Sequence, residues 1–240
     1  MRLIDIESRR TVTRVPDLGP VWSLAFVPDG RSAFYGHRDN SLRIVDLQSG
    51  RELQRLQGHS SQPEVVVCSP DGRYAVSGRT DADEVADAVL VWDLQSGVKL
   101  RHPERHMSLV TALAISADSR RALTGTGDGY VFLWEVETGR EIRRYQGHAG
   151  NVNAVAFSPD NRFVVSGSGT DFFDADLIKE LGVDNTVRIW DAASTHEVAR
   201  CTGHASGVTS VAVSPNGRYV LSGSKDKTVR LWHVPEALAR

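Results

Sequence analysis

Short runs of apolar, often β-branched residues recur along the chain, and turn residues separate them. The last copy is the clearest: residues 208–214, 218–224 and 228–234 read VTSVAVS, RYVLSGS and TVRLWHV, with Pro-Asn-Gly and Lys-Asp-Lys between them. Such alternating runs predict short β-strands. Proline presets φ for a turn and glycine tolerates a positive φ, so the breaks predict hairpins.

A fourth strand is predicted in most copies after a second turn, as at 52–57, 141–146 and 197–202. The closing residue of each third strand is also periodic. Four closing residues are tryptophan and one is valine, and a histidine follows 14 residues after the closing residue in four copies. Periods of roughly 40 residues are typical of propellers and other repeat folds. The closing residues are Val45, Trp92, Trp134, Trp190 and Trp232.

Two dipeptides recur at fixed places in these copies. Gly-His stands at 58–59, 147–148 and 203–204, and Trp-Asp stands at 92–93 and 190–191. With this spacing, nearly the whole chain resembles the WD-repeat β-propeller family. The resemblance implies an all-β fold in which four-stranded blades surround a central channel. It also implies a buried network of His, Ser or Thr, Asp and Trp in each blade.

We therefore expect one WD-repeat β-propeller domain over residues 1–240, with five four-stranded blades. The repeats run from about 17–59, 59–106, 106–148, 148–204 and 204–240. The last repeat has no fourth strand of its own, so residues 1–16 are expected to close the ring as a strand. The alternative is an open arc, completed by another chain or by missing sequence.

The expected network has the spacing 0, 18, 22 and 28 in the third and last copies. In the second copy the aspartate of the network could be either Asp81 or Asp87. In the first copy the four network positions hold Asp17, Tyr35, Asp39 and Val45, so the network is expected to be lost there. A Ser-His-Asp set invites a catalytic interpretation. Several partial copies in one chain, each expected under a tryptophan, favour a structural role instead. The expected network residues are His59, Ser77, Trp92, His106, Thr124, Asp128, Trp134, His148, Ser166, Asp184, Trp190, His204, Ser222, Asp226 and Trp232.

Function on a repeat scaffold is expected where the copies differ. Two insertions, at 80–87 and 170–183, fall between second and third strands, which the family places on one face. The larger one suggests a short amphipathic helix, either packed on the propeller or facing a partner; the smaller one is acidic and favours a solvated loop over a cation site. Trp22 stands where the other copies carry polar residues, as either an interface anchor or a space-filling side chain. The candidate partner-binding residues are Trp22, Arg38, Phe172, Phe173, Leu177 and Lys225.

The composition argues against several classes of protein. The 240 residues carry a net charge of −2, which argues against a general nucleic-acid or anionic-membrane binder. No apolar run is long enough to span a bilayer, and no signal segment is evident, so a cytoplasmic protein is expected. The two cysteines indicate neither a disulfide scaffold nor a metal motif. We expect no catalytic residues, cofactor or metal.

The resemblance thus favours a non-enzymatic scaffold that binds a protein or peptide on its top face, as a monomer or possible homo-oligomer. Two alternatives stay open. One is a regulatory or sensor fragment of a larger multi-domain protein. The other is a sugar-binding or enzymatic propeller, which would require a deep pocket lined by polar or titratable groups outside the repeated network.

Overall fold

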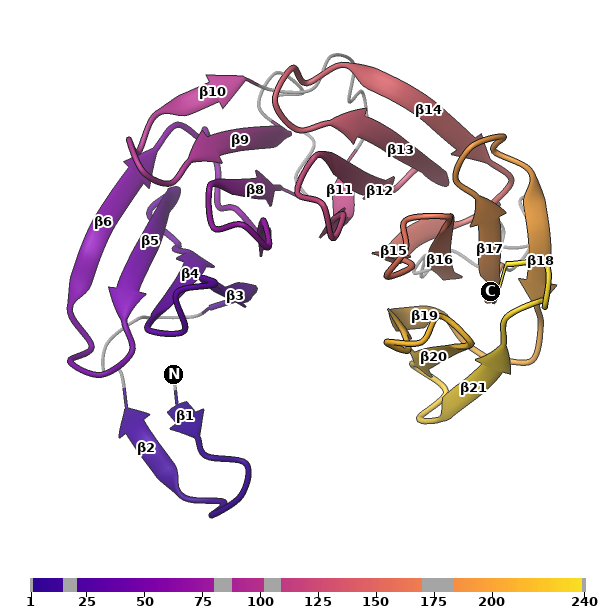
Figure 1. Ribbon diagram of the computed structural model, residues 1–240, viewed down its shortest axis with the longest axis horizontal. Helices are drawn as coiled ribbons and strands as arrows, with labels where there is room; N and C mark the ends of the chain where they lie inside the picture. The colour runs from indigo at the N-terminus through magenta and orange to yellow at the C-terminus, as the bar shows by residue number, and fades with distance from the viewer. Residues whose placement is uncertain (1, 15–20, 80–87, 102–108, 170–183, 239–240) are drawn as a thin grey trace. The chain divides into compact units, whose positions relative to one another are not determined.

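The computed structural model describes residues 2–14, 21–79, 88–101, 109–169 and 184–238. Every regular element in these ranges is a β-strand, and neighbouring strands pair antiparallel (Figure 1). The all-β prediction is therefore confirmed. Within the same ranges, no helix could cross a membrane. The chain divides into two compact units, Met1–His102 and Pro103–Arg240.

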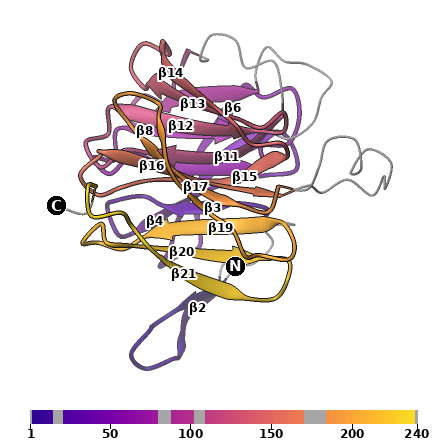
Figure 2. The same ribbon diagram turned by 90° about the vertical axis from the view of Figure 1, so that its right-hand side faces the viewer.

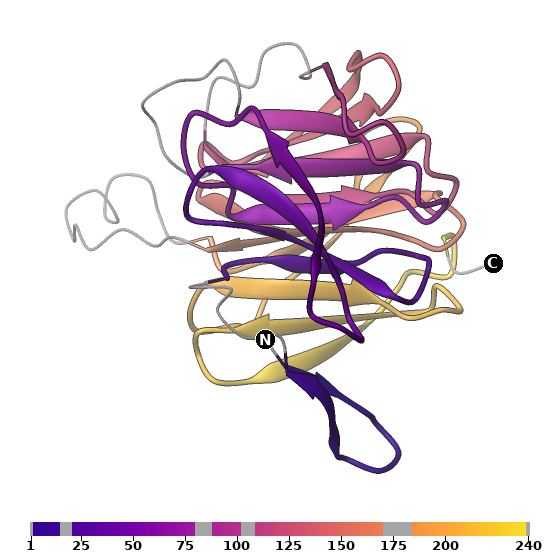
Figure 3. The same ribbon diagram turned by 90° about the vertical axis from the view of Figure 1, so that its left-hand side faces the viewer.

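The first unit contains one hairpin and two four-stranded sheets (Figure 3). The hairpin consists of β1 (Arg2–Ile4) and β2 (Thr11–Arg14). The first sheet consists of β3 (Leu24–Phe26), β4 (Ser32–Gly36), β5 (Ser41–Asp46) and β6 (Glu52–Gln57). The second sheet consists of β7 (Val65–Cys68), β8 (Tyr74–Gly78), β9 (Val89–Asp93) and β10 (Lys99–Arg101).

The second unit contains two four-stranded sheets and one three-stranded sheet (Figure 2). The third sheet consists of β11 (Val110–Ile115), β12 (Arg121–Thr126), β13 (Tyr130–Glu135) and β14 (Glu141–Gln146). The fourth sheet consists of β15 (Asn151–Phe157), β16 (Phe163–Gly169), β17 (Val187–Asp191) and β18 (Glu197–Cys201). The fifth sheet consists of β19 (Val208–Val213), β20 (Tyr219–Ser224) and β21 (Val229–His233).

The fifth sheet is the one that departs from the four-stranded pattern. Its strand order is β19-β20-β21, and β2 pairs with β1 rather than with a strand of that sheet. The structure therefore does not show closure of a ring by residues 1–16. That role, like the single domain over 1–240, stays a prediction.

The turn between the first and second strands is the same in all five sheets. One residue there adopts a positive φ, between 59° and 72°. An Asp or Asn three residues before the second strand's start accepts backbone N–H groups and so tightens the turn, as Asp29 does from Arg31 and Ser32 at 2.8 Å. Pro-Asp-Gly at 28–30 and 70–72 and Pro-Asn-Gly at 215–217 predict this turn in three copies, whereas in the other two a serine and an asparagine adopt the left-handed conformation. The positive-φ residues are Gly30, Gly72, Ser119, Asn161 and Gly217.

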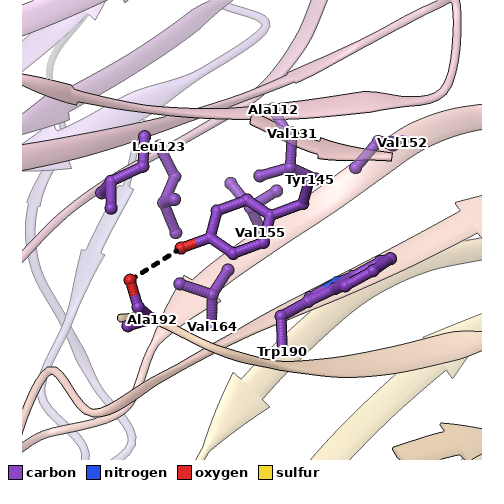
Figure 4. Close-up of a cluster of buried hydrophobic side chains, with 10 residues drawn as sticks. Ala112, Leu123, Val131, Tyr145, Val152, Val155, Val164, Trp190 and Ala192 are labelled. Carbon is purple, nitrogen blue, oxygen red and sulfur yellow. Dashed lines mark hydrogen bonds between the residues drawn. The ribbon is translucent and has the colours of Figure 1, made fainter. Parts of the chain in front are cut away.

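The core lies mostly between neighbouring sheets rather than inside one. Between the third and fourth sheets, side chains from β12, β13 and β14 meet others from β15, β16 and β17 (Figure 4). Tyr145 on β14 reaches across, and its hydroxyl donates to the carbonyl of Ala192 at 3.5 Å. Leu123 and Val131 of the third sheet and Val152 of the fourth are completely buried there. The third and fourth sheets thus cover each other's apolar faces.

Candidate functional site

A chain of four hydrogen-bonded side chains runs through the fourth sheet. Trp190 on β17 donates its Nε1–H to Ser166 Oγ on β16 at 2.8 Å. Nε2 of His148 lies 2.7 Å from the same Oγ, and its Nδ1 lies 2.9 Å from Oδ2 of Asp184. An ionised carboxylate can only accept, so Nδ1 carries the proton and Nε2 accepts from the serine hydroxyl. The chain ties two strands to the two loops that hold His148 and Asp184.

The fifth sheet repeats this arrangement at the matching positions. Trp232 donates to Ser222 Oγ at 2.8 Å, and His204 Nε2 lies 2.8 Å from the same oxygen. His204 Nδ1 lies 2.8 Å from Asp226 Oδ2, which also accepts the backbone N–H of Ala205 at 3.0 Å. The structure therefore brings together all four predicted residues in each of these two sheets.

The second sheet shows three of its four members. Trp92 donates to Ser77 Oγ at 2.8 Å, and His59 Nε2 lies 2.6 Å from the same oxygen. The two candidate acids, Asp81 and Asp87, lie outside the described residues. In three sheets, the serine hydroxyl therefore accepts a hydrogen bond from the tryptophan and contacts the histidine.

The third sheet differs from the others. His106 lies outside the described residues, and Thr124 takes the serine position, fully buried. The buried Nε1 of Trp134 has no hydrogen-bond partner in the described part of the chain. Threonine carries a γ-methyl group and is restricted at χ1, unlike serine. Asp128 accepts from the hydroxyl of Thr126 at 2.5 Å.

In the first sheet the serine and tryptophan of the network are replaced, but a cluster of polar side chains around an aspartate is kept. Tyr35 and Val45 fill those two places and are buried. Asp39 nevertheless accepts from Ser41 Oγ at 2.5 Å and lies 2.7 Å from Nδ1 of His37. Burial would raise the pKa of Asp39, but these contacts outweigh it and hold the pKa well below its usual range. Sequence reasoning missed His37 because it stands outside the expected spacing.

Sequence reasoning also missed an arginine that joins the aspartate to the fourth strand. Arg188 lies 3.0 Å from Asp184 Oδ2 through one terminal nitrogen and 2.8 Å from Glu197 Oε2 through the other. Arg43 contacts Glu52 at 3.2 Å in the first sheet and also pairs with the aspartate there. The available signal was an Asp-x-x-x-Arg spacing, at 39–43, 184–188 and 226–230.

Burial sets the protonation of the pair in the fourth sheet. The His148 and Asp184 side chains are 1% and 4% exposed. Burial lowers the pKa of His148, and the hydrogen bond to Asp184 offsets this only in part. Burial works to raise the pKa of Asp184, but hydrogen bonds led by that from His148 hold it well below its usual range. The favoured state is a neutral imidazole beside a carboxylate.

The serine, histidine and aspartate contact one another in the same order as in a hydrolytic Ser-His-Asp triad, but the surroundings of these residues do not suit catalysis. The serine is completely buried, and its Oγ already accepts the Trp190 N–H. A nucleophile needs a substrate carbonyl within reach and an accessible oxygen. The geometry favours a tie between strands.

The candidate partner-binding residues fall in different parts of the chain. Trp22 precedes β3 by two residues and Arg38 follows β4 by two, so both stand at the same end of this antiparallel strand pair. Trp22 is 66% exposed, and Arg38 and Lys225 are exposed as well. Phe172, Phe173 and Leu177, with both insertions 80–87 and 170–183, lie outside the described residues.

A surface hollow of about 920 Å³ lies in the first unit, between the turns of the first two sheets. Its wall includes Pro28, Asp29, Leu53 and Asp71. Asp29 is occupied by its own turn, where it accepts two backbone N–H groups. No group of three or more potential metal-ligating side chains occurs within the described ranges. The hollow offers no set of convergent catalytic groups among its lining residues.

Comparison with known proteins agrees with the repeated architecture. The family described as "WD domain, G-beta repeat" matches residues 11–46, 50–84, 97–135, 139–191 and 195–233. The chain is 41% identical over 66 residues to Polycomb protein EED of Chaetomium thermophilum, covering 25% of this chain and 12% of that protein. It is 45% identical over 49 residues to apoptotic protease-activating factor 1 of Danio rerio, covering 20% and 4%.

A third relative is eukaryotic translation initiation factor 3 subunit I of Aspergillus niger, 39% identical over 61 residues, covering 25% of this chain and 18% of that protein. The matched segments thus span between 4% and 18% of the length of these three relatives. The likeness concerns one or two repeats in each case.

Proposed function

The chain belongs to the WD-repeat family, and we propose that it is a non-enzymatic scaffold that binds a protein or peptide. The proposed surface is the top face, which carries the loops between the second and third strands of each blade. WD-repeat proteins are typically interaction scaffolds. One relative is named as a subunit of an initiation factor, which supports a role inside an assembly.

The observation that carries the proposal is the exposure of Trp22. The matching positions in the other sheets hold Glu64, Thr111, Asn153 and Thr209, so an aromatic side chain there is peculiar to the first sheet. Tryptophan and arginine are enriched among residues that dominate binding energy at interfaces. Trp22 and Arg38 stand at one end of the same strand pair, where one ligand could contact both.

A non-catalytic role is supported by the buried serines. In the fourth sheet the Ser166 hydroxyl is enclosed and already bonded to two neighbours. We propose that the repeated network serves folding, and that binding depends on the residues in which the copies differ. The insertion 170–183 belongs to the proposed surface because the family places such loops on the top face.

A second candidate is a regulatory or sensor portion of a larger multi-domain protein. The observation that favours it is the small share of the relatives that the matches cover, 4% in the case of apoptotic protease-activating factor 1. In that case the same face would bind another part of the same polypeptide or its target. A cytoplasmic location is compatible with both candidates and stays a proposal.

The test is affinity capture followed by measurement with the purified partner. Trp22→Ala and a chain in which a short turn replaces 170–183 should each weaken binding at least about tenfold, the loss expected for an interface anchor. Leu53→Ala is the matched control, because Leu53 is also an exposed apolar residue of the first sheet, 58% exposed, but lies on the outer strand β6. Equal affinity of Trp22→Ala and wild type would contradict the proposed surface.

A further inference from the structure

The hollow between the first two sheets lies where the first sheet departs from the repeated sequence. In the fourth sheet the second strand begins with Phe163, which is completely buried in one cluster with Val220 of the fifth sheet. In the first sheet the second strand begins with Ser32, which lines the hollow. The space between the first two sheets is thus open at a position that a phenylalanine fills between the fourth and fifth. The residues that begin the other second strands are all large: Tyr74, Arg121, Phe163 and Tyr219.

A second departure is the residue that directly follows the first strand of each sheet. In four sheets it is a serine whose hydroxyl donates to the aspartate or asparagine of the turn, at distances between 2.5 and 2.7 Å. The first sheet has Val27 there, which also lines the hollow, and Asp29 accepts from the hydroxyl of Ser32 at 2.8 Å. Both departures fall at the hollow, and function on a repeat scaffold is expected where the copies differ.

The hollow combines an apolar floor with an acidic rim. Ile44 in its lining is only 7% exposed, and Val27 and Leu94 are half-buried. Asp29 and Asp71 are exposed. The described lining residues include no lysine, arginine or histidine. An apolar group can therefore be covered at the floor while a cation is held at the rim.

The two carboxylates stand on turns that touch each other. A Cβ at Gly72 would lie 3.7 Å from Cδ of Pro28, so the turn that holds Asp71 packs on the turn that holds Asp29. Burial works to raise the pKa of Asp29, but hydrogen bonds led by that from the N–H of Arg31 hold it below its ordinary value of 3.8. The rim therefore carries negative charge at neutral pH.

We propose that this hollow binds a basic peptide segment of a partner protein, in which an apolar side chain stands next to a lysine or arginine. The apolar side chain covers Ile44 and Leu94, and the cationic group lies against Asp29 and Asp71. A cationic occupant follows from the charge of the rim, since complementary charges favour one partner over others. A peptide fits better than a small molecule because the rim is exposed, whereas small-molecule sites bury most of their ligand.

This site is separate from the top face. Trp22 and Arg38 stand where β3 begins and β4 ends, whereas Val27 and Ser32 stand where β3 ends and β4 begins. Because these two strands are antiparallel, the hollow lies at the opposite end of the strand pair. The chain can therefore hold one partner at each end of its first sheet.

The probe is a library of random octapeptides displayed on phage and selected for binding to the full chain. The selected peptides should contain a lysine or arginine next to an apolar residue. Calorimetry with synthetic copies of these peptides then measures their affinity at low and high salt concentration. Binding should weaken as the salt concentration rises, because mobile ions screen exposed charges.

Two changes to the hollow locate the binding. Ser32→Phe introduces the residue that the fourth sheet carries and should weaken binding about tenfold or more, because the ring fills the hollow. Asp29→Asn combined with Asp71→Asn removes the charge and keeps the turns, since Asn216 holds the same turn in the fifth sheet by accepting the N–H of Arg218 at 3.1 Å. This double variant should weaken binding about fivefold or more.

Two matched controls should bind the peptides as wild type does. Asp118→Asn combined with Asp160→Asn makes the same change in the turns of the third and fourth sheets, and neither residue lines the hollow. Trp22→Ala removes the proposed anchor of the top face. Circular dichroism checks that every variant folds.

Three results would overturn the proposal. The first is a selection that yields no binding peptide, or peptides in which lysine and arginine are not enriched. The second is binding that neither Ser32→Phe nor the double variant at Asp29 and Asp71 weakens. The third is binding that Trp22→Ala abolishes and Ser32→Phe does not, which places the peptide on the top face. Failure at the hollow leaves the top-face function standing, because that function is measured with its own captured partner.

Discussion

At the residue scale, a serine hydroxyl on the second strand of three sheets holds two neighbours at once. Each accepts a tryptophan N–H and contacts a histidine nitrogen, at distances between 2.6 and 2.8 Å. Removing one member takes a buried hydrogen-bond partner from each of its neighbours, which costs more than the hydrogen bond itself contributes. The histidines should therefore matter for the stability of the fold.

His148→Ala should lower the free energy of unfolding by about 1–3 kcal/mol, because Ser166 and Asp184 each lose a buried partner. His196→Ala is the matched control, since His196 belongs to the same repeat and is exposed. Chemical denaturation of the two variants measures the difference. Equal losses in both would refute the structural role assigned to His148.

Acid should weaken the fold through the same histidine. The pKa of His148 in the folded protein lies below its ordinary value of 6.5, so the unfolded chain binds more protons just below pH 6.5. Stability therefore rises with pH in that window and falls as the pH drops through it. Asp184, whose pKa is also lowered, adds a further loss below about its ordinary value of 3.8.

The measurement is the free energy of unfolding of wild type and His148→Gln between about pH 7 and pH 5, the window around the ordinary histidine pKa. Wild type should lose more stability over this range than the variant, because glutamine does not titrate. A difference between the two proteins that stays constant with pH would argue against a lowered pKa at His148.

At the element scale, Gly58 and Gly147 of two Gly-His pairs allow a tryptophan of the next sheet to approach closely. A Cβ at Gly58 would lie 2.8 Å from Cη2 of Trp92, and one at Gly147 would lie 3.1 Å from Cη2 of Trp190. The Gly-His motif is thus a packing requirement between consecutive sheets as well as the start of the hydrogen-bonded chain. It links the end of one fourth strand to the third strand of the next sheet.

Gly58→Ala should cost about 1–3 kcal/mol of stability, the range for overpacking a dense core. Trp92→Phe removes the ring atom that the new Cβ would meet. In the Trp92→Phe background, the cost of Gly58→Ala should shrink, and a double-mutant cycle measures this coupling. If the effects of the two substitutions on stability are additive, the alanine side chain does not clash with the indole ring.

At the scale of the whole molecule, the same apolar positions are buried in some sheets and exposed in the last. Val165, Val187 and Ile189 of the fourth sheet are completely buried against a cluster that includes Val208 of the fifth. Their counterparts Leu221, Val229 and Leu231 are between 46% and 67% exposed. The outer edge of β21 has no paired strand among the described residues.

Deleting residues 1–16 tests the closing role that the sequence suggested for them. If these residues close the ring, the deletion should speed amide hydrogen exchange at residues 229–233, because an edge strand that loses its partner opens more readily. Unchanged exchange there would contradict the closing role. Mass-spectrometric detection of exchange in both chains provides the comparison.

The sequence by itself determined the strands, the turns and the repeated spacing of His, Ser and Trp, because these follow from local patterns. β-branched alternation and Pro-Asn-Gly act over a few residues, and the repeat period sets which residues share a position. The spacing of His148, Ser166 and Trp190 was readable for this reason, and the structure places them within hydrogen-bond distance.

Only the tertiary structure decided which repeated residues lie against a neighbour. Val187 and Val229 stand in nearly identical strands, yet Val187 is buried in a cluster with Val208 of the fifth sheet, whereas Val229 is 67% exposed. The pairing of Arg188 with both Asp184 and Glu197 likewise arises from strands that meet in space. Likewise, only the tertiary structure shows that Leu3 of the β1–β2 hairpin packs against the first sheet.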